Sequence, residues 1–138
     1  MIVLDTNVLS ALMQQVPDKD VVAWLDRQPR ASIWTTSVTV LEIRFGLQSM
    51  PGGKRRSALI ASFQELLNRI GNRVVPFDIA AAEAAGDLMA FRYKSGSPGD
   101  LRDTMIAGIV VAQHATLATR NTTHFEDIPA PLINPWIV

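Results

Sequence analysis

Short apolar segments alternate along the chain with segments of helical periodicity, and this alternation is what most constrains the fold. Strands that alternate with helices form parallel βαβ units. We therefore expect an α/β fold, a three-layer α/β/α sandwich around a central, mostly parallel sheet of four to five strands. The expected strands are Met1–Leu4, Ala31–Thr35, Arg73–Pro76, Thr116–Thr119 and, from a weaker pattern, Pro131–Asn134. The expected helices are Asn7–Met13, Val21–Gln28, Val38–Ser49, Arg56–Ile70, Ala80–Tyr93 and Leu101–His114, with loops at 51–53 and 95–100.

Composition limits the class of protein. Of the 138 residues, 48% are apolar and 19% are charged, which suits a single domain, residues 1–138, with one sizeable core. The chain has no cysteine, so disulfides and thiolate metal ligands are excluded. No run is long and apolar enough for a membrane helix, and no secretory signal is visible, so we expect a cytoplasmic protein. Thirteen basic residues balance 13 acidic ones, which argues against strong non-specific binding to nucleic acid but not against an enzyme that contacts it briefly.

A carboxylate, Asp5, directly follows the apolar run Ile2–Leu4. In open parallel sheets, ligands bind at the carboxyl ends of the strands, which is where this pattern places Asp5. The structural alternative is that Asp5, Thr6 or Asn7 only caps the following helix.

A second carboxylate, Glu42, lies on a predicted helix among apolar or small neighbours. The residues one, three and four positions away are Val38, Leu41, Phe45 and Gly46. A carboxylate in such surroundings is expected to be partly buried, and buried Glu is rare unless it is paired or binds metal. The alternative is a structural ion pair with Arg120 or another arginine.

A third carboxylate, Asp103, heads the inward face of a predicted helix. The apolar residues three, four, seven and eight positions later are Ile106, Ala107, Val110 and Val111. The alternative is an acid that stabilises the start of its own helix, but Asp100, one turn earlier, can do this at the surface. At the end of the strand Thr116–Thr119, Asn121 can act as a ligand or hold a water, or be a plain turn residue.

Three carboxylates that converge in one cleft would raise one another's pKa values, and a divalent cation removes this penalty. Oxygen ligands without cysteine or clustered histidine suit Mg²⁺ or Mn²⁺ rather than Zn²⁺. We therefore expect Asp5, Glu42 and Asp103 to be the ligands of such an ion.

Four motifs in the same order resemble those of the PIN domain. They are LDTNVLS at 4–10, TVLEIRFGL at 39–47, RDTMIAGI at 102–109 and ATRNTTHF at 118–125. Within that family the chain resembles the VapC-type toxins of bacterial toxin–antitoxin modules, near the FitB-like branch, and the closing INPW at 133–136 fits that branch.

The resemblance implies a metal-dependent endoribonuclease with an acidic Mg²⁺ or Mn²⁺ pocket. Asp5, Glu42 and Asp103 match the first three family acids, and Asn121 stands where the family often has a fourth, which puts a second cation in doubt. Thr6, Asn7 and Thr119 match the supporting polar residues. The resemblance also implies a homodimer, a small VapB/FitA-like antitoxin, and a higher assembly with the antitoxin on DNA.

In the expected chemistry, Asp5 and Asp103 hold a cation that activates a water for in-line attack on an RNA phosphodiester. Glu42 positions that water, Asn121 holds the leaving oxygen or a water, and the helix that starts near Asp103 adds its positive end.

The residues that contact the substrate are harder to identify. Three arginines next to the site residues can meet phosphates or pair with the acids: Arg44, Arg102 and Arg120. The basic run Lys54–Arg56 is expected to be solvated surface. We expect core or interface roles for Trp24, Trp34 and Trp136, and structural or surface roles for His114 and His124, although His124 is near enough in sequence to contact substrate.

Two rival functions remain at this stage. One is a non-catalytic binding module, which Asn121 in place of an acid favours. The other is an aspartate-based phosphotransfer domain of the receiver or haloacid-dehalogenase type, with Asp5 as nucleophile. That chemistry needs a lysine at the pocket, and none of Lys19, Lys54 and Lys94 follows a predicted core strand.

Overall fold

A five-stranded parallel sheet forms the middle layer of the computed structural model, which describes residues 1–138. The strands run in the order β3-β2-β1-β4-β5, so the first strand in sequence is central. Their bounds are β1 Ile2–Leu4, β2 Ile33–Thr36, β3 Val74–Val75, β4 Thr116–Ala118 and β5 Leu132–Ile133. All pairings are parallel, and β1 pairs Val3 with Trp34 on one side and with Leu117 on the other. All carboxyl ends of the strands therefore lie at one edge.

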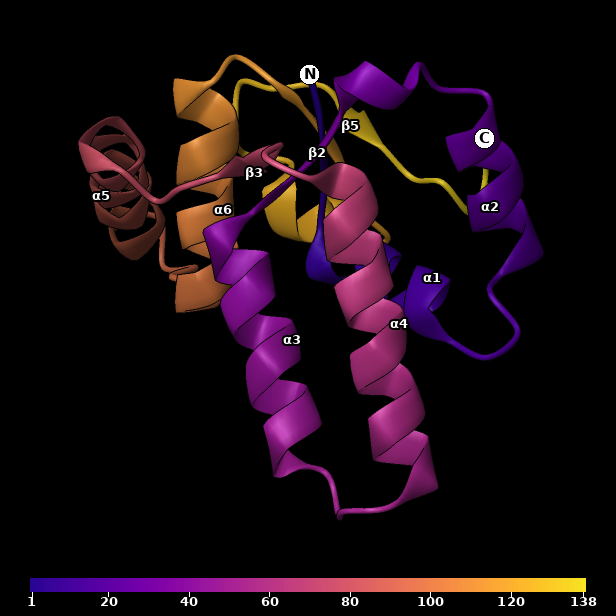
Figure 1. Ribbon diagram of the computed structural model, residues 1–138. Helices are drawn as coiled ribbons and strands as arrows, with labels where there is room; N and C mark the ends of the chain where they lie inside the picture. The colour runs from indigo at the N-terminus through magenta and orange to yellow at the C-terminus, as the bar shows by residue number, and fades with distance from the viewer.

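Helices cover both faces of this sheet (Figure 1). Their bounds are α1 Thr6–Met13, α2 Lys19–Asp26, α3 Ser37–Ser49, α4 Lys54–Ile70, α5 Ile79–Lys94 and α6 Leu101–Ala112. Two short 3-10 turns, at Arg30–Ser32 and Thr122–Phe125, complete the chain. Figure 1 shows α3 and α4 side by side, extending beyond the sheet, with α5 outermost against α6.

Alternate residues of the central strands point to opposite faces and divide the apolar interior in two. Val3 and Leu117 join a cluster with α5 and α6, whereas Leu4 and Ala118 join a cluster with α1, α2, α3 and α4. The expected three-layer architecture, with five strands and six helices, is confirmed. The two 3-10 turns were not expected, because three or four residues carry too little periodicity to be recognised. No helix in the molecule is both long and apolar enough to cross a membrane.

Polar side chains directly before the first turn fix where four of the helices begin. The capping side chains accept backbone N–H groups of the first turn, which would otherwise lack partners. They are Asp18 for α2, Thr36 for α3, Asp78 for α5 and Asp100 for α6. The last of these places Asp103 in the first turn of α6, as the sequence predicted.

The outermost helix, α5, approaches α6 closely because α6 has a glycine at the crossing point. A Cβ built on Gly108 would lie 2.5 Å from the carbonyl oxygen of Ala81 and 2.7 Å from the Cβ of Ala85. Since these contacts are with backbone and a short side chain, no rotamer change can relieve them.

Substitution of Gly108 by alanine should therefore reduce the free energy of unfolding by about 1–3 kcal/mol, because the two helices must separate. Urea unfolding followed by circular dichroism measures this change. Gly86→Ala on α5 is the matched control: a Cβ there meets nothing within 4 Å, so it should stabilise the helix by about 0.5–1 kcal/mol. If both substitutions changed the free energy of unfolding equally, α5 and α6 would not be in the close contact at Gly108 that the structure shows.

Candidate functional site

The first carboxylate of the site, Asp5, lies directly after the central strand β1 and is only 3% exposed. Its Oδ1 accepts the backbone N–H of Thr6 at 2.8 Å, so Asp5 is also the N-cap of α1. Its Oδ2 accepts the hydroxyl of Thr119 at 2.8 Å and the side-chain amide of Asn7 at 3.3 Å. The capping role and the position at the sheet edge are thus both present in one residue.

The neighbouring strand β4 contributes to the same edge through Thr119 and the two residues after it. The Thr119 hydroxyl oxygen accepts the backbone N–H of Asn121 at 3.0 Å, and the Oδ1 of Asn7 accepts the backbone N–H of Arg120 at 3.0 Å. The expected supporting residues Thr6, Asn7 and Thr119 therefore all contact Asp5 or connect it to β4.

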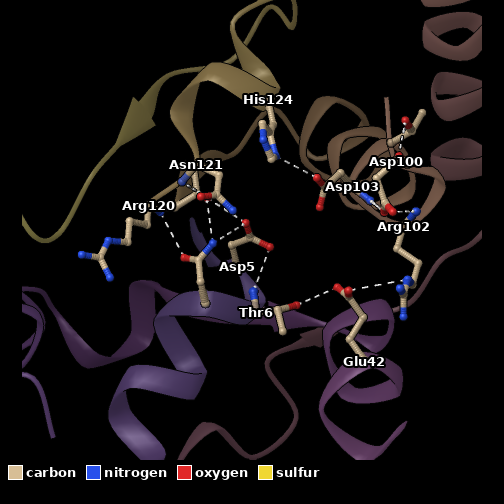
Figure 2. A network of polar contacts seen from close by, with 12 residues as sticks. Asp5, Thr6, Glu42, Asp100, Arg102, Asp103, Arg120, Asn121 and His124 are labelled. Carbon is tan, nitrogen blue, oxygen red and sulfur yellow. Dashed lines mark hydrogen bonds and ion pairs between the residues drawn. The ribbon is translucent and has the colours of Figure 1, made fainter. Parts of the chain in front are cut away.

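Glu42 is held on α3 by hydroxyl groups. The Thr6 hydroxyl donates to Glu42 Oε1 at 2.8 Å (Figure 2). Thr6 Oγ1 also lies 3.2 Å from Thr39 Oγ1. The Glu42 side chain is 19% exposed, as expected for a partly buried carboxylate. The reason expected from the sequence was wrong, because the flanking Leu41 and Phe45 are 55% and 62% exposed. The polar contacts of Glu42, not apolar neighbours on its own helix, define its environment.

The arginine that faces Glu42 is Arg102 rather than Arg120. Arg102 Nε lies 3.7 Å from Glu42 Oε2, and the Arg102 side chain is 43% exposed, so the pair is loose and weak. Asp5, Glu42 and the first turn of α6 thus surround the same region, as Figure 2 shows.

Asp103 lies across from Asp5 and pairs with a histidine from the turn that follows β4. Asp103 Oδ2 is 3.1 Å from Nδ1 of His124. Both side chains border a polar pocket of about 390 Å³, whose other lining residues are Arg92, Ser97, Gly99, Asp100, Thr123, Glu126 and Asp127. Sequence reasoning gave His124 only a minor place, because a lone histidine has no partner at metal-ligand spacing.

A buried arginine fixes this half of the site. Arg92, 4% exposed, forms two hydrogen bonds to the carboxylate of Asp127, at 2.8 and 2.9 Å. It also donates to the Thr104 hydroxyl and to the carbonyl oxygen of His124, each at 2.8 Å. Sequence reasoning missed Arg92 and Asp127. The available signal was an arginine on the buried face of α5, in line with Ala81 and Ala85.

The start of α6 differs from the expectation in one respect. The carboxylate of Asp100 accepts the backbone N–H groups of Arg102 and Asp103, at 2.9 and 3.1 Å. The helix was expected to present its positive end to the pocket. That expectation was wrong for the N–H groups of Arg102 and Asp103, because the carboxylate of Asp100 already accepts both.

Burial raises the pKa of Asp5 from 3.8 to about 6. Hydrogen bonds from the Thr119 hydroxyl and the Thr6 amide oppose the rise, while the negative charges of Asp103 and Glu42 add to it. On the other side of the pocket, the guanidinium of Arg92 lowers the pKa of Asp127. A cation bound beside Asp5 would favour its charged form and so offset the cost of its burial.

The donor atoms near Asp5 are carboxylate, hydroxyl and amide oxygens, which suit a hard divalent cation. No group of three His, Cys, Asp or Glu side chains is arranged to hold one ion. These residues thus fit a hydrated ion, held partly through water as Mg²⁺ commonly is, better than a fully dehydrated one.

Other candidates from the sequence lie elsewhere. Arg44 is exposed on α3, and Lys54–Arg56 begin α4 at the far end of the α3–α4 pair. Trp24 and Trp34 pack in the two apolar clusters, as expected. His114 follows α6 in a left-handed conformation with φ 52°. Asn121 is exposed, and only its backbone groups make hydrogen bonds in this site: its N–H donates to Thr119 and its carbonyl oxygen accepts the N–H of His124.

Comparison with known proteins agrees with this geometry. Residues 2–131 match the PIN domain family, and the chain belongs to that family. Within it, the chain is 43% identical to the VapC ribonuclease Y4jK of Sinorhizobium fredii, covering 99% of this chain and 98% of the relative. It is 31% identical to the toxin FitB of Neisseria gonorrhoeae, covering 99% of both. A structure of FitAB bound to an IR36 DNA fragment covers all of this chain and 97% of that chain, with a TM-score of 0.90 and 30% identity.

The chain is thus similar to VapC-type and FitB-like toxins, as its motifs indicated. Membership of the PIN domain family removes the phosphotransfer alternative. The structure agrees, because Lys19, Lys54 and Lys94 are exposed at helix ends and none lines the pocket.

The raised pKa of Asp5 predicts how stability depends on pH when a chelator has removed divalent cations. Unfolded Asp5 loses its proton near pH 3.8 but folded Asp5 near pH 6, so the folded state binds more protons between these values and its stability falls as pH rises. Asp5→Asn should therefore exceed the native chain in unfolding free energy by roughly 2–3 kcal/mol above about pH 7, with the difference shrinking toward pH 4. Urea unfolding across this range measures it.

Asp20→Asn is the control for this measurement, because Asp20 is an exposed acid near the start of α2. It should leave the pH profile unchanged. A difference between Asp5→Asn and the native chain that does not vary with pH would contradict the raised pKa.

Proposed function

We propose that this chain is the toxin of a toxin–antitoxin pair and acts as an endoribonuclease that depends on a divalent cation, Mg²⁺ or Mn²⁺. The observation that carries the proposal is the buried carboxylate of Asp5 at the carboxyl edge of the sheet, with Glu42 and Asp103 close enough to raise its pKa. Its relatives support the same activity, since one is named a VapC ribonuclease and another a toxin.

The residues proposed to hold the cation are Asp5, Asp103 and Glu42, in part through water. When bound, the cation supplies Lewis acidity and charge neutralisation for hydrolysis of a phosphodiester bond. Asn121 stands in the position of a fourth acid, and its neutral side chain supports one ion rather than two.

The chain's own residues then orient the reacting groups. The Thr6 amide and the Thr119 hydroxyl fix both oxygens of Asp5, so this carboxylate cannot rotate away from the pocket. The Thr6 hydroxyl donates to one oxygen of Glu42, which leaves the other to accept a proton from the attacking water once Arg102 moves aside. His124, whose Nδ1 lies 3.1 Å from Asp103 Oδ2, is placed to contact a substrate oxygen, and Asn121 can hold the leaving oxygen or a water.

Asp103→Asn should reduce RNA cleavage by about a hundredfold or more while the chain stays folded, because it removes a charge but keeps the shape. Purified protein, incubated with bacterial RNA and Mg²⁺ or Mn²⁺, is assayed by mapping the new RNA ends. Asp100→Asn is the matched control on the same helix, because asparagine caps α6 as well as aspartate does. It should retain most of the activity.

The same variants test the biological role. Induced expression of the native chain in a bacterium should arrest growth, Asp103→Asn should not, and co-expression of the adjacent gene should restore growth if it encodes the VapB/FitA-like antitoxin. Cleavage that persists in purified Asp103→Asn would refute the nuclease assignment. Native protein that binds Mn²⁺ but cuts no RNA would favour the alternative, a binding module without catalysis.

Exposed apolar side chains on α3 and α5 support the proposed homodimer. Leu41 and Phe45 lie one turn apart on α3, and Ile79 and Phe91 lie near the two ends of α5, with 55–78% of each side chain exposed. Large exposed apolar side chains on the surface of a domain are typical of protein–protein contacts. We propose that two copies of the chain pack through these exposed apolar side chains, with Phe45 in the contact, and that the antitoxin brings dimers together on DNA.

Phe45→Asp should convert the dimer to a monomer, because a buried unpaired carboxylate opposes association. Sedimentation velocity or light scattering at micromolar concentration reports the mass. Val16→Asp is the control, since Val16 is 85% exposed in the loop between α1 and α2. A native chain that is already monomeric, or a Phe45→Asp variant that remains dimeric, would rule out this interface.

A further inference from the structure

An arginine beside the acidic pocket is held in place but has no acidic partner. The backbone N–H of Arg120 donates to Asn7, whose side-chain amide in turn donates to Asp5. The Arg120 side chain is directed away from the carboxylates, as Figure 2 shows. Its position relative to the pocket is therefore fixed through two hydrogen bonds, while its guanidinium lies outside the pocket.

The guanidinium of Arg120 lies over a tryptophan. Its central carbon is 4.8 Å from the centroid of the Trp136 ring. Trp136 itself packs against the apolar cluster of α1, α2, α3 and α4, and its backbone N–H donates to the Asn134 side chain at 3.0 Å. A guanidinium on an ordered aromatic ring has lost much of its rotamer freedom before any ligand binds, so less entropy is lost on binding.

The other arginines of the site already have acidic partners. Arg92 is bound to Asp127, and Arg102 faces Glu42. No carboxylate lies within ion-pair distance of Arg120, which is exposed. Its N–H donors are therefore free to bind an anion from solution.

An acidic pocket repels a polyanionic strand, so a substrate strand needs a cation next to the carboxylates. A planar guanidinium binds phosphate through two parallel hydrogen bonds, and its stacking on Trp136 holds it in place to do so. We propose that Arg120, stacked on Trp136, is a subsite for single-stranded RNA that binds a phosphate next to the one being cut. This inference rests on the proposed function and names how the strand is held.

The test measures RNA binding without cleavage, in the Asp103→Asn variant. Fluorescence anisotropy of a labelled single-stranded RNA, titrated over a range of salt concentrations without divalent cation, gives the affinity and its salt dependence. The double variant Asp103→Asn, Arg120→Gln should bind this RNA about tenfold more weakly than Asp103→Asn alone. It should also reduce the slope of log affinity against log salt by about 0.7, the loss of one phosphate contact on a single strand.

Three further variants separate charge, stacking and folding. Arg120→Lys should keep the salt slope but lose affinity, because lysine has the charge without the planar fork. Trp136→Leu should lose affinity with an unchanged slope, because no charge is removed. Arg30→Gln is the matched control, an exposed arginine before β2 at the opposite edge of the sheet, and should change neither quantity. Thermal unfolding of each variant checks that it is folded.

The outcomes distinguish this inference from the function on which it rests. If Asp103→Asn binds RNA and Arg120→Gln changes neither affinity nor slope, the subsite is wrong and the nuclease assignment stands. An equal loss in Arg30→Gln would also overturn the subsite, because binding would then be diffuse. If the protein binds no RNA at all, both proposals fail.

Discussion

The arrangement of the site depends on one costly feature, the burial of the Asp5 carboxylate at the end of the central strand. Burial in a low-dielectric interior opposes the charged form, and the nearby Asp103 and Glu42 oppose it further. Two hydrogen bonds, from Thr6 and Thr119, compensate only in part. A residue that lowers stability in this way at a sheet edge is typical of a site that is completed by a ligand.

The site is assembled from two halves that belong to different layers. In one half, hydroxyl groups connect α3 to α1, through Thr36, Thr39, Thr6 and finally Glu42. In the other, the buried Arg92 ties α5 to the start of α6 and to the turn that carries His124. The two halves face each other across Asp5, so their separation is set by the packing of helices on the two faces of the sheet.

Charge is distributed unevenly in a chain that is neutral overall. Acidic side chains gather at the carboxyl edge, where the positive charges of Arg92 and Arg102 are already engaged. Arg120 is different, because its guanidinium faces an aromatic ring rather than a carboxylate. Zero net charge therefore does not exclude binding of a nucleic-acid strand, because such binding depends on the local arrangement of positive side chains beside the site.

The sequence by itself determined the order of strands and helices, the edge of the sheet where the site lies, and the acids Asp5 and Asp103 at that edge. These follow from periodicity and from the rule that parallel strands end together, both of which are local or topological. Only the tertiary structure decided that Glu42 faces Thr6 and Arg102, that His124 meets Asp103, and that Arg92 joins three segments. Such contacts depend on side-chain directions and helix packing between residues far apart in the chain, about which sequence spacing carries no information.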